Sequence, residues 1–222
     1  MGREELEVLK SGAVKRKSKR KIGIFIDGIG LDRATRRLYR KVDLSRLVSG
    51  LKSGLEVEVA RYYTLVPYED DARQFAFLDA VERAGLEVVT KRLPPKGVKR
   101  QVSMDVHLAT DLVSFSMGIY ENLAKAKEKK EQEKIAVNDI PSSTTTTGIT
   151  KEPAIQPSSN SKIKRVAAVI CPGREVTYAM YVANQAGVET SLVDFGLYGS
   201  SDGWRGVDRW VDLSTSETIW RD

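Results

Sequence analysis

Short runs of apolar, β-branched residues alternate along the chain with stretches in which apolar residues recur every three or four positions. The first pattern is typical of buried strands and the second of amphipathic helices. The expected strands are residues 22–26, 57–66, 86–93, 166–171 and 188–195, and the expected helices are residues 31–51, 70–84, 103–117 and 175–186. Strands that alternate with helices predict an α/β fold, with a mostly parallel central sheet flanked by helices on both faces.

Two segments do not follow this alternation. Residues 1–20 are charged and offer few apolar side chains, so we expect a basic flexible arm there. Residues 121–163 begin with a run of Lys and Glu and continue as a Ser/Thr/Pro tract, which predicts a helix extension that leads into a low-complexity insertion. We therefore expect one domain over residues 21–214 that contains this insertion, followed by a short tail at residues 215–222.

The composition narrows the chemistry that the chain can perform. Its 36 Lys and Arg residues exceed its 30 Asp and Glu residues, and the net charge of +6 favours an anionic partner such as nucleic acid. Cys171 is the only cysteine and His107 the only histidine, which excludes an intramolecular disulfide and a zinc site of the usual Cys/His type. The longest apolar run, residues 166–171, is far shorter than the roughly 20 residues of a membrane helix. With no apolar leader in the arm, we expect a cytoplasmic protein without a membrane partner.

Several common kinds of catalytic site are absent from the sequence. No phosphate loop of the form G-x-x-x-x-G-K-[ST] occurs, and no nucleophile-elbow sequence accompanies the single histidine. Gly28 and Gly30 follow the first strand as they do in dinucleotide-binding folds, but Arg33 stands at the third position, where close packing of helix on strand requires Gly or Ala. Because Asp and Glu remain plentiful, a metal ion held by carboxylates is the catalytic chemistry that we expect.

Four acidic residues follow the expected strands closely. Asp27 ends the first strand, Asp105 and Asp111 lie in the helix after the third strand, and Glu175 comes shortly after the fourth. Ligands of an open α/β sheet bind at the carboxyl ends of its strands, so these four residues can converge on one edge. Clustered carboxylates suit Mg²⁺ or Mn²⁺, which activate water and stabilise the leaving oxygen in phosphodiester cleavage.

The same spacing leaves a structural alternative open. A step of six residues separates Asp105 from Asp111 by about 120° around a helix, so both can face one metal only if Asp105 lies in an irregular first turn. Otherwise Asp105 favours the positive end of its helix, Asp111 pairs with a nearby arginine, and Glu175 complements the dipole of its own helix.

Four motifs occur in order along the expected domain, interrupted only by the insertion. They are Ile24-Phe25-Ile26-Asp27-Gly28 followed by Gly30-Leu31, then Lys96-Gly97 with the helix from Met104 to Leu112, then Cys171 to Val176, and finally Val207 to Leu213. In order and spacing these motifs resemble the NYN domain, the LabA-like branch of the PIN-fold ribonucleases.

The resemblance implies a PIN-like domain that cleaves RNA with bound Mg²⁺ or Mn²⁺, and homodimers are common among such domains. The acidic residues at the positions of the metal ligands are Asp27, Asp105, Asp111 and Glu175. Two positions depart from the family's motifs. The family has an Asn where this chain has Gly30. It also has an S-G-D-S-D-F turn where this chain has Cys171 to Val176, and Gly173 stands in place of the first Asp of that turn. These departures leave a second reading open, in which the chain is a catalytically degenerate RNA-binding or scaffolding module of the same fold.

Basic residues flank the acidic positions on both sides. The expected RNA-binding residues are Arg33, Arg36, Arg37 and Arg40 on the helix after the first strand, and Lys96, Lys99 and Arg100 before the acidic helix. Such charge can hold a polyanion whose scissile phosphate reaches the metal. Alternatively, the four arginines simply form the solvent-exposed face of their helix.

Aromatic residues give a weaker signal. Tyr62, Tyr63 and Tyr68 can stack on the bases of a single strand, but packing in the strand is the commoner role for the first two. The tryptophans expected to cover the sheet edge or an interface are Trp204, Trp210 and Trp220.

Overall fold

The fold is described from a computed structural model that covers residues 19–69, 71–137, 163–196 and 206–221. Its centre is a sheet of six parallel strands in the order β3-β2-β1-β4-β5-β6. The strands are β1 (Arg20–Asp27), β2 (Glu56–Val66), β3 (Glu87–Arg92), β4 (Lys164–Ile170), β5 (Glu189–Asp194) and β6 (Arg209–Asp212). The predicted α/β fold with a parallel sheet is confirmed.

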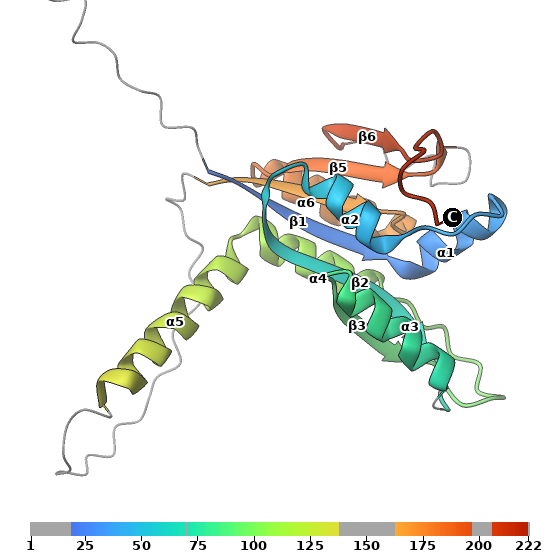
Figure 1. The fold of residues 1–222 in the computed structure, drawn as a ribbon, viewed down its shortest axis with the longest axis horizontal. Coiled ribbons are helices and arrows are strands. Elements are labelled where there is room, and N and C mark those ends of the chain that lie inside the picture. Colours follow the sequence, from blue (N-terminus) through green and yellow to red (C-terminus); the bar gives the residue numbers. More distant parts are fainter. Residues whose placement is uncertain (1–18, 70, 138–162, 197–205, 222) are drawn as a thin grey trace, which may run out of the picture.

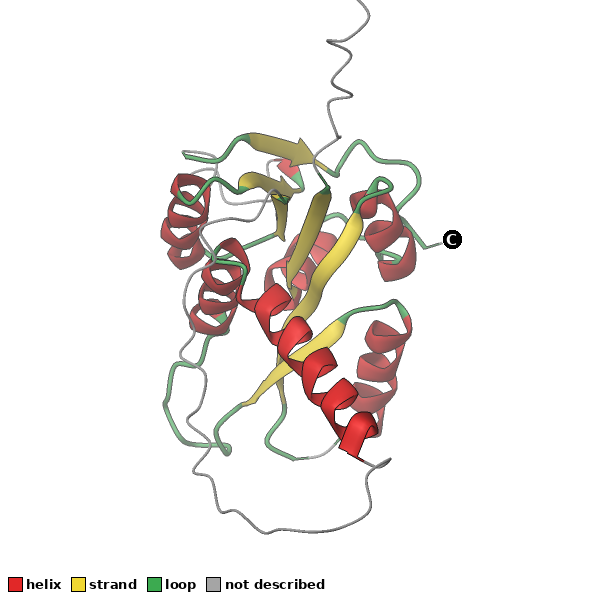
Figure 2. Ribbon diagram, turned by 90° about the vertical axis from the view of Figure 1, so that its left-hand side faces the viewer, coloured by secondary structure: helices red, strands yellow, loops and turns green. Residues whose placement is uncertain are grey.

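Helices pack on both faces of this sheet (Figures 1 and 2). They are α1 (Gly28–Arg37), α2 (Leu44–Lys52), α3 (Ala72–Arg83), α4 (Asp105–Ser116), α5 (Ile119–Val137) and α6 (Thr177–Gln185), with a short 3₁₀ turn, η2 (Arg174–Val176), before α6. Across the described ranges, no helix combines the length and the apolar character that a membrane crossing requires.

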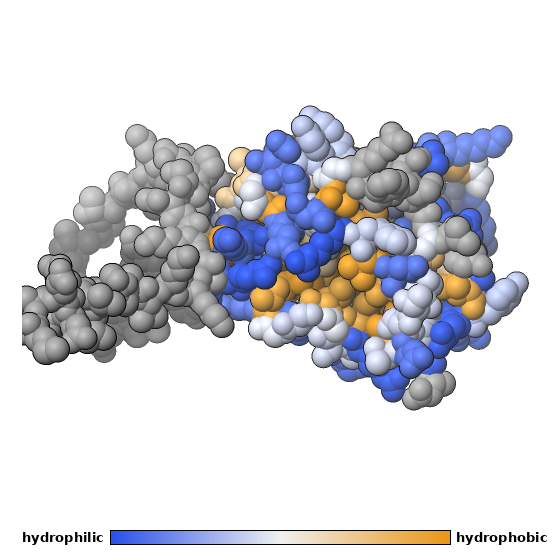
Figure 3. Space-filling view, turned by 90° about the horizontal axis from the view of Figure 1, so that it is seen from above, coloured by the Kyte–Doolittle hydropathy of each residue, from blue (hydrophilic) through white to orange (hydrophobic). Residues whose placement is uncertain are grey.

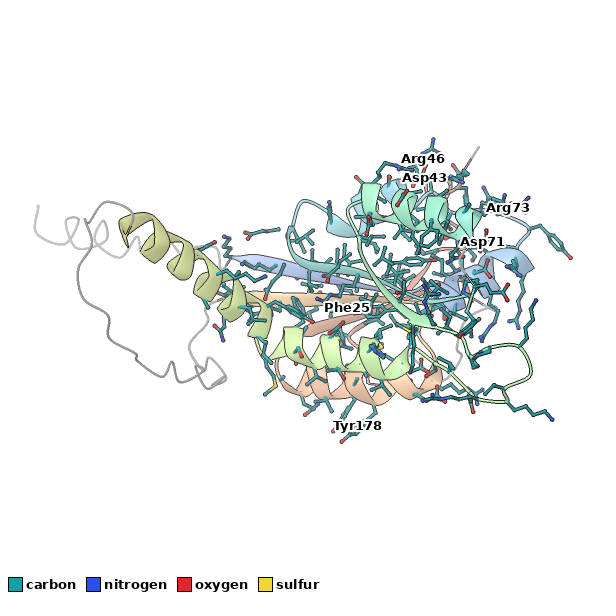
Figure 4. All side chains as sticks on the ribbon, turned by 90° about the horizontal axis from the view of Figure 1, so that it is seen from below. Phe25, Asp43, Arg46, Asp71, Arg73 and Tyr178 are labelled. Atoms are coloured by element: carbon teal, nitrogen blue, oxygen red, sulfur yellow. The ribbon has the colours of Figure 1, made fainter. Side chains whose placement is uncertain are left out.

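The alternation of side chains along β1 divides the core into two layers. Ile24 and Ile26 point to one face, where they pack with buried residues of α1, α2 and α3. Phe25 points to the other face and packs with residues of α4 and α6, including Phe115, whose ring lies 5.7 Å away. Figure 4 shows Phe25 in the middle of the molecule and Tyr178 directed outward from α6. Both faces of β1 are therefore covered, as expected for a continuous apolar run.

The order of the strands creates a switch point beside β1. From β1 the chain moves outward through β2 and β3, and it later returns to the other side of β1 with β4 and continues outward through β5 and β6. The helices that follow β1 and β4 therefore leave the sheet on opposite faces, and sheets of this kind bind ligands at the carboxyl ends of such a pair of strands. Asp27, the last residue of β1, lies at this switch point.

Several predicted boundaries are wrong for local reasons. The single helix expected over residues 31–51 is two helices, because the chain turns at Tyr39, which has a φ of 51°, and restarts at Asp43, whose side chain caps α2. Ser103 does not cap α4. The capping position is Met104, whose side chain makes no capping hydrogen bond. Residues 174–176 form a 3₁₀ turn, so α6 begins later than predicted.

Helix α5 extends away from the sheet, past the amino ends of the strands (Figure 1). A buried ion-pair network anchors its base, where Arg165 lies 3.1 Å from Glu58 and 2.6 Å from Glu121. The helix confirms the extension predicted after residue 121, while residues 138–162 of the expected insertion lie outside the described residues. Most of the expected arm, residues 1–18, also lies outside them, and Arg20 already belongs to β1.

The tryptophans do not share one role. Trp220 is buried against Phe195, with the two ring centroids 5.6 Å apart, and thereby covers the sheet as expected. Trp210 is 52% exposed on the edge strand β6. Figure 3, which views the molecule from the side of β6, shows apolar residues open at the surface among hydrophilic ones. Trp204 lies outside the described residues.

Candidate active site

Asp27 is the most constrained acidic residue of the predicted site. Its side chain is buried and caps α1, with Oδ1 accepting hydrogen bonds from the backbone N–H groups of Ile29 at 3.0 Å and Gly30 at 3.2 Å. The sequence causes this arrangement because an Asp that follows a buried strand directly can serve as the N-cap of the next helix. These two hydrogen bonds hold the Asp27 carboxylate in one orientation at the switch point.

The surroundings of Asp27 do not fully compensate its negative charge. The pKa of Asp27 is raised to about 6, mainly by burial and in smaller part by the nearby carboxylate of Asp105, against the opposing effects of two backbone N–H groups and Arg33. A carboxylate that is buried and repelled by another carboxylate is one that a bound cation would stabilise.

Asp105 and Glu175 meet on either side of Gly173. A Cβ atom built on Gly173 would lie 2.7 Å from Asp105 Oδ1 and 3.3 Å from Glu175 Oε2, so both carboxylates flank this glycine. Asp105 is the first residue of α4, and Glu175 lies in the 3₁₀ turn η2. The first turn of α4 and the turn after β4 therefore bring two of the predicted ligands to the same edge as Asp27.

Asp111 lies in a different environment. Its Oδ2 accepts a hydrogen bond from the Tyr63 hydroxyl at 2.8 Å and lies 2.7 Å from Arg61 Nη1, while its Oδ1 accepts from the Tyr120 hydroxyl at 2.8 Å. Arg61 in turn pairs with Glu87 at 2.9 Å. The six-residue step along α4 thus separates Asp111 from Asp105, and the expected alternative of an arginine partner holds for Asp111.

The carboxylates suit a hydrated metal ion better than one enclosed by protein ligands. Within the described part of the chain, no three Asp, Glu, His or Cys side chains converge closely enough to hold a metal ion. Mg²⁺ often keeps several waters and is held by one or two carboxylates together with substrate phosphate oxygens. Asp27 and Asp105 lie close enough to each other to interact electrostatically.

Asp194 is an acidic residue at this edge that the sequence analysis missed. It ends β5, is 2% exposed, and its Oδ1 accepts from the backbone N–H of Phe195 at 2.7 Å and from Cys171 Sγ at 3.8 Å. Burial raises the pKa of the Cys171 thiol, and the charges of Asp194 and Asp27 add to this effect. Its position in the sequence could have indicated it, because Asp194 is the last residue of an apolar strand, as Asp27 is.

The first departure from the family motifs, Gly30, lies against the turn that contains the second departure, Gly173. A Cβ atom on Gly30 would lie 2.0 Å from the carbonyl oxygen of Cys171, which itself adopts a left-handed φ of 51°. The turn after β4 therefore occupies the space that an Asn side chain at position 30 would need. Gly30 and the altered turn at Cys171 are compatible with each other, whereas an Asn at position 30 would require this turn to move.

The start of α1 is also unsuited to a dinucleotide. The strand order observed here occurs in dinucleotide-binding sheets as well, where a pyrophosphate binds the free N–H groups at the start of the first helix. Here the Asp27 carboxylate accepts from those N–H groups. This geometry agrees with the sequence, in which Arg33 at the third glycine position already argued against a dinucleotide site.

The basic residues of α1 have different partners. Arg33 lies near enough to lower the pKa of Asp27, and Arg36 pairs with Asp32 at 3.0 Å. Arg40, which lies beyond the end of α1, stacks over the ring of Trp220 at 4.1 Å. The residues that are exposed to solvent include Arg33, Arg36, Arg37 and Arg40, together with Lys96, Lys99 and Arg100 in the loop between β3 and α4. The loop lies after the carboxyl end of β3, on the edge that carries the acidic residues.

Comparison with known proteins finds a family match for part of the chain. Residues 21–124 match the sequence profile of the NYN domain. This segment is an NYN domain. It contains Asp27, Asp105 and Asp111, while Glu175 and the strands β4, β5 and β6 lie beyond the matched part of the NYN domain.

The fold as a whole is similar to a crystal structure of a protein of unknown function from Vibrio parahaemolyticus RIMD 2210633. The TM-score is 0.61 at 12% sequence identity, and the match covers 92% of this chain and 98% of that one. At this identity the similarity concerns the fold alone. No curated protein matches the sequence.

Proposed function

We propose that the chain is a metal-dependent endoribonuclease that hydrolyses phosphodiester bonds of RNA at the carboxyl ends of β1 and β4. The observation that carries the proposal is Asp27, a buried carboxylate fixed by two backbone N–H groups and left with a raised pKa beside Asp105. NYN domain membership supports a nuclease of this kind.

Each predicted residue has a distinct part in this proposal. Asp27 and Asp105 hold a hydrated Mg²⁺ or Mn²⁺, and Glu175, which is exposed, completes the shell from the solvent side. A metal held in this way supplies an activated water and stabilises the leaving oxygen. Arg33 and the basic loop at residues 96–100 hold the RNA backbone next to the carboxylates.

Asp111 takes a positioning role in this proposal, in place of the metal-binding role expected from the motif. Its bonds to Arg61 and Tyr63 join α4 to β2, and its bond to Tyr120 joins α4 to α5. These bonds orient the helix whose first residue is Asp105. A change at Asp111 therefore acts on the site through the placement of α4.

Cleavage of a labelled single-stranded RNA in Mn²⁺ tests the proposal. We expect Asp27→Asn to lower the rate at least about a hundredfold, a loss of roughly the size that removing one key catalytic group produces. RNA binding should stay equal or become tighter, because a negative charge is removed. We expect Glu175→Gln to lower cleavage as well. Glu82→Gln is the matched control, since Glu82 is an exposed glutamate on α3, and it should change neither property. Full cleavage by Asp27→Asn would overturn the metal assignment.

A second candidate is a non-catalytic RNA-binding or scaffolding module. It is favoured by the Arg61 and tyrosine bonds that occupy Asp111 and by Gly173, which stands in place of a motif carboxylate. Calorimetric titration with Mn²⁺ separates the two candidates. RNA binding without any Mn²⁺ binding, in the presence or absence of RNA, would favour the module. A homodimer also stays a prediction, which the molar mass from light scattering tests.

A further inference from the structure

A groove of about 550 Å³ lies beside the acidic edge, between α1 and α3. Tyr62 and Phe77 form its aromatic wall, with ring centroids 5.9 Å apart in an edge-to-face arrangement. Arg36, Lys41 and Arg221 give it a cationic lining. The volume lies within the range of ligand-binding pockets and suits a ligand about as large as one nucleotide.

The groove begins next to the proposed active site. Its lining includes Gly28 and Ile29, the first residues of α1, and the backbone N–H of Ile29 is one of the donors that hold Asp27. A strand with one phosphate at Asp27 would therefore have a neighbouring nucleotide beside the groove.

Tyr62 contributes a buried hydroxyl to the groove. Its side chain is 4% exposed, and a Cβ atom on Gly28 would lie 2.6 Å from the hydroxyl, so the ring packs directly against the first turn of α1. Within the described ranges, the structure gives this hydroxyl no hydrogen-bond partner. A buried hydroxyl without a partner is unfavourable, and a ligand in the groove would satisfy it.

We propose that this groove binds one base of the RNA strand, next to the phosphate that reaches Asp27. The inference rests on the proposed function, because the position of the groove matters only if RNA lies along the acidic edge. Phe77 is 42% exposed and offers a ring on which any base can stack. The Tyr62 hydroxyl bonds the base or its ribose, and the cations attract the neighbouring phosphates, although Asp32 in the lining partly neutralises Arg36.

Binding of short RNAs with a single abasic position tests the groove. In EDTA, where metal-dependent cleavage cannot occur, fluorescence anisotropy gives the affinity of the full chain for a set of oligonucleotides that each lack one base. We expect one abasic position to weaken binding to the unmodified protein about tenfold. In Phe77→Ala, the same abasic position should have no further effect. Phe75→Ala is the matched control, because Phe75 is a similarly exposed phenylalanine of α3 that lies outside the groove lining, and it should keep the full abasic effect.

Tyr62→Phe provides a second variant that retains the packing of the ring. It removes a hydroxyl without a protein partner, so its melting temperature should equal or exceed that of the unmodified protein, while the affinity for RNA falls several-fold. An abasic profile that is the same in Phe77→Ala and in the unmodified protein would overturn the groove proposal. If cleavage still requires Asp27, the proposed function stands without the groove. Absence of any RNA binding by the unmodified protein would overturn both.

Discussion

Asp27 and Asp111 are both expected metal ligands, and their surroundings differ fundamentally. Asp27 has two backbone N–H groups as hydrogen-bond donors and another carboxylate nearby, so its charge is only partly compensated. Asp111 has an arginine and two tyrosine hydroxyls, from Arg61, Tyr63 and Tyr120. The same residue type therefore stands in two different electrostatic environments within one domain. The donors around a carboxylate indicate its role more directly than its place in a motif.

The largest expected effect on stability concerns Asp111. Asp111→Ala removes one of the two carboxylates paired with Arg61 and the acceptor of two tyrosine hydroxyls, and we expect it to lower the free energy of unfolding by about 3 kcal/mol. Urea denaturation measures this change. Mn²⁺ affinity of the folded variant should stay within a few-fold of the unmodified value. A complete loss of Mn²⁺ binding by a folded variant would instead make Asp111 a ligand.

The next largest effect is on Mn²⁺ binding, which should distinguish Asp27 from Asp111. Mn²⁺ at about 100 times its dissociation constant should stabilise the protein by about 2.7 kcal/mol, because it binds only the folded chain. The gain should disappear in Asp27→Asn and persist in Asp111→Asn, when unfolding is followed with and without Mn²⁺. Equal loss in both variants would mean that the two carboxylates share one metal.

The pH dependence of stability gives a third distinction. Burial raises the folded-state pKa of Asp27 to about 6, above its ordinary value of 3.8, so folding favours the protonated form. Stability of the metal-free protein therefore falls as the pH rises from about 4 to about 6, and it stays lower above that range. We expect Asp27→Asn to be more stable than the unmodified protein by about 2 kcal/mol at pH 7 and to show no such advantage near pH 4. Urea denaturation at both pH values measures this, and a variant that is less stable at pH 7 contradicts it.

The sequence predicted the features that depend on residues close together along the chain. Asp27 was found because it directly follows a buried apolar strand, and the fold class followed from the alternation of strands and helices. The environment of Asp111 depends on Arg61, Tyr63 and Tyr120, which come from β2 and α5 and meet it only through packing. No local pattern in α4 could indicate those partners.

Contacts between distant residues explain the remaining surprises. The aromatic contact of Tyr62 with Phe77 joins β2 to α3, so the groove was invisible in the sequence, and Tyr62 itself was correctly expected to be packed. The close approach of Gly30 to Cys171 joins the start of α1 to the turn after β4. The sequence showed Gly30 as a departure from the family motifs, but its contact with the turn at Cys171 is visible only in the fold.

The smallest expected effect tests the contact between Gly30 and the turn at Cys171, next to Asp27. In Gly30→Ala the new methyl group would lie 2.0 Å from the Cys171 carbonyl oxygen and 3.1 Å from Asp27 Oδ2, so the turn after β4 must shift. We expect a loss of about 1 kcal/mol in the free energy of unfolding, which exceeds the gain in helix propensity from replacing glycine. Gly50→Ala is the control, because Gly50 lies in α2 with nothing within 4 Å of a new Cβ atom, and it should stabilise the protein by about 0.5 kcal/mol. If both variants gain stability, the contact between Gly30 and Cys171 is not tight, and an Asn at position 30 would be accommodated beside Asp27.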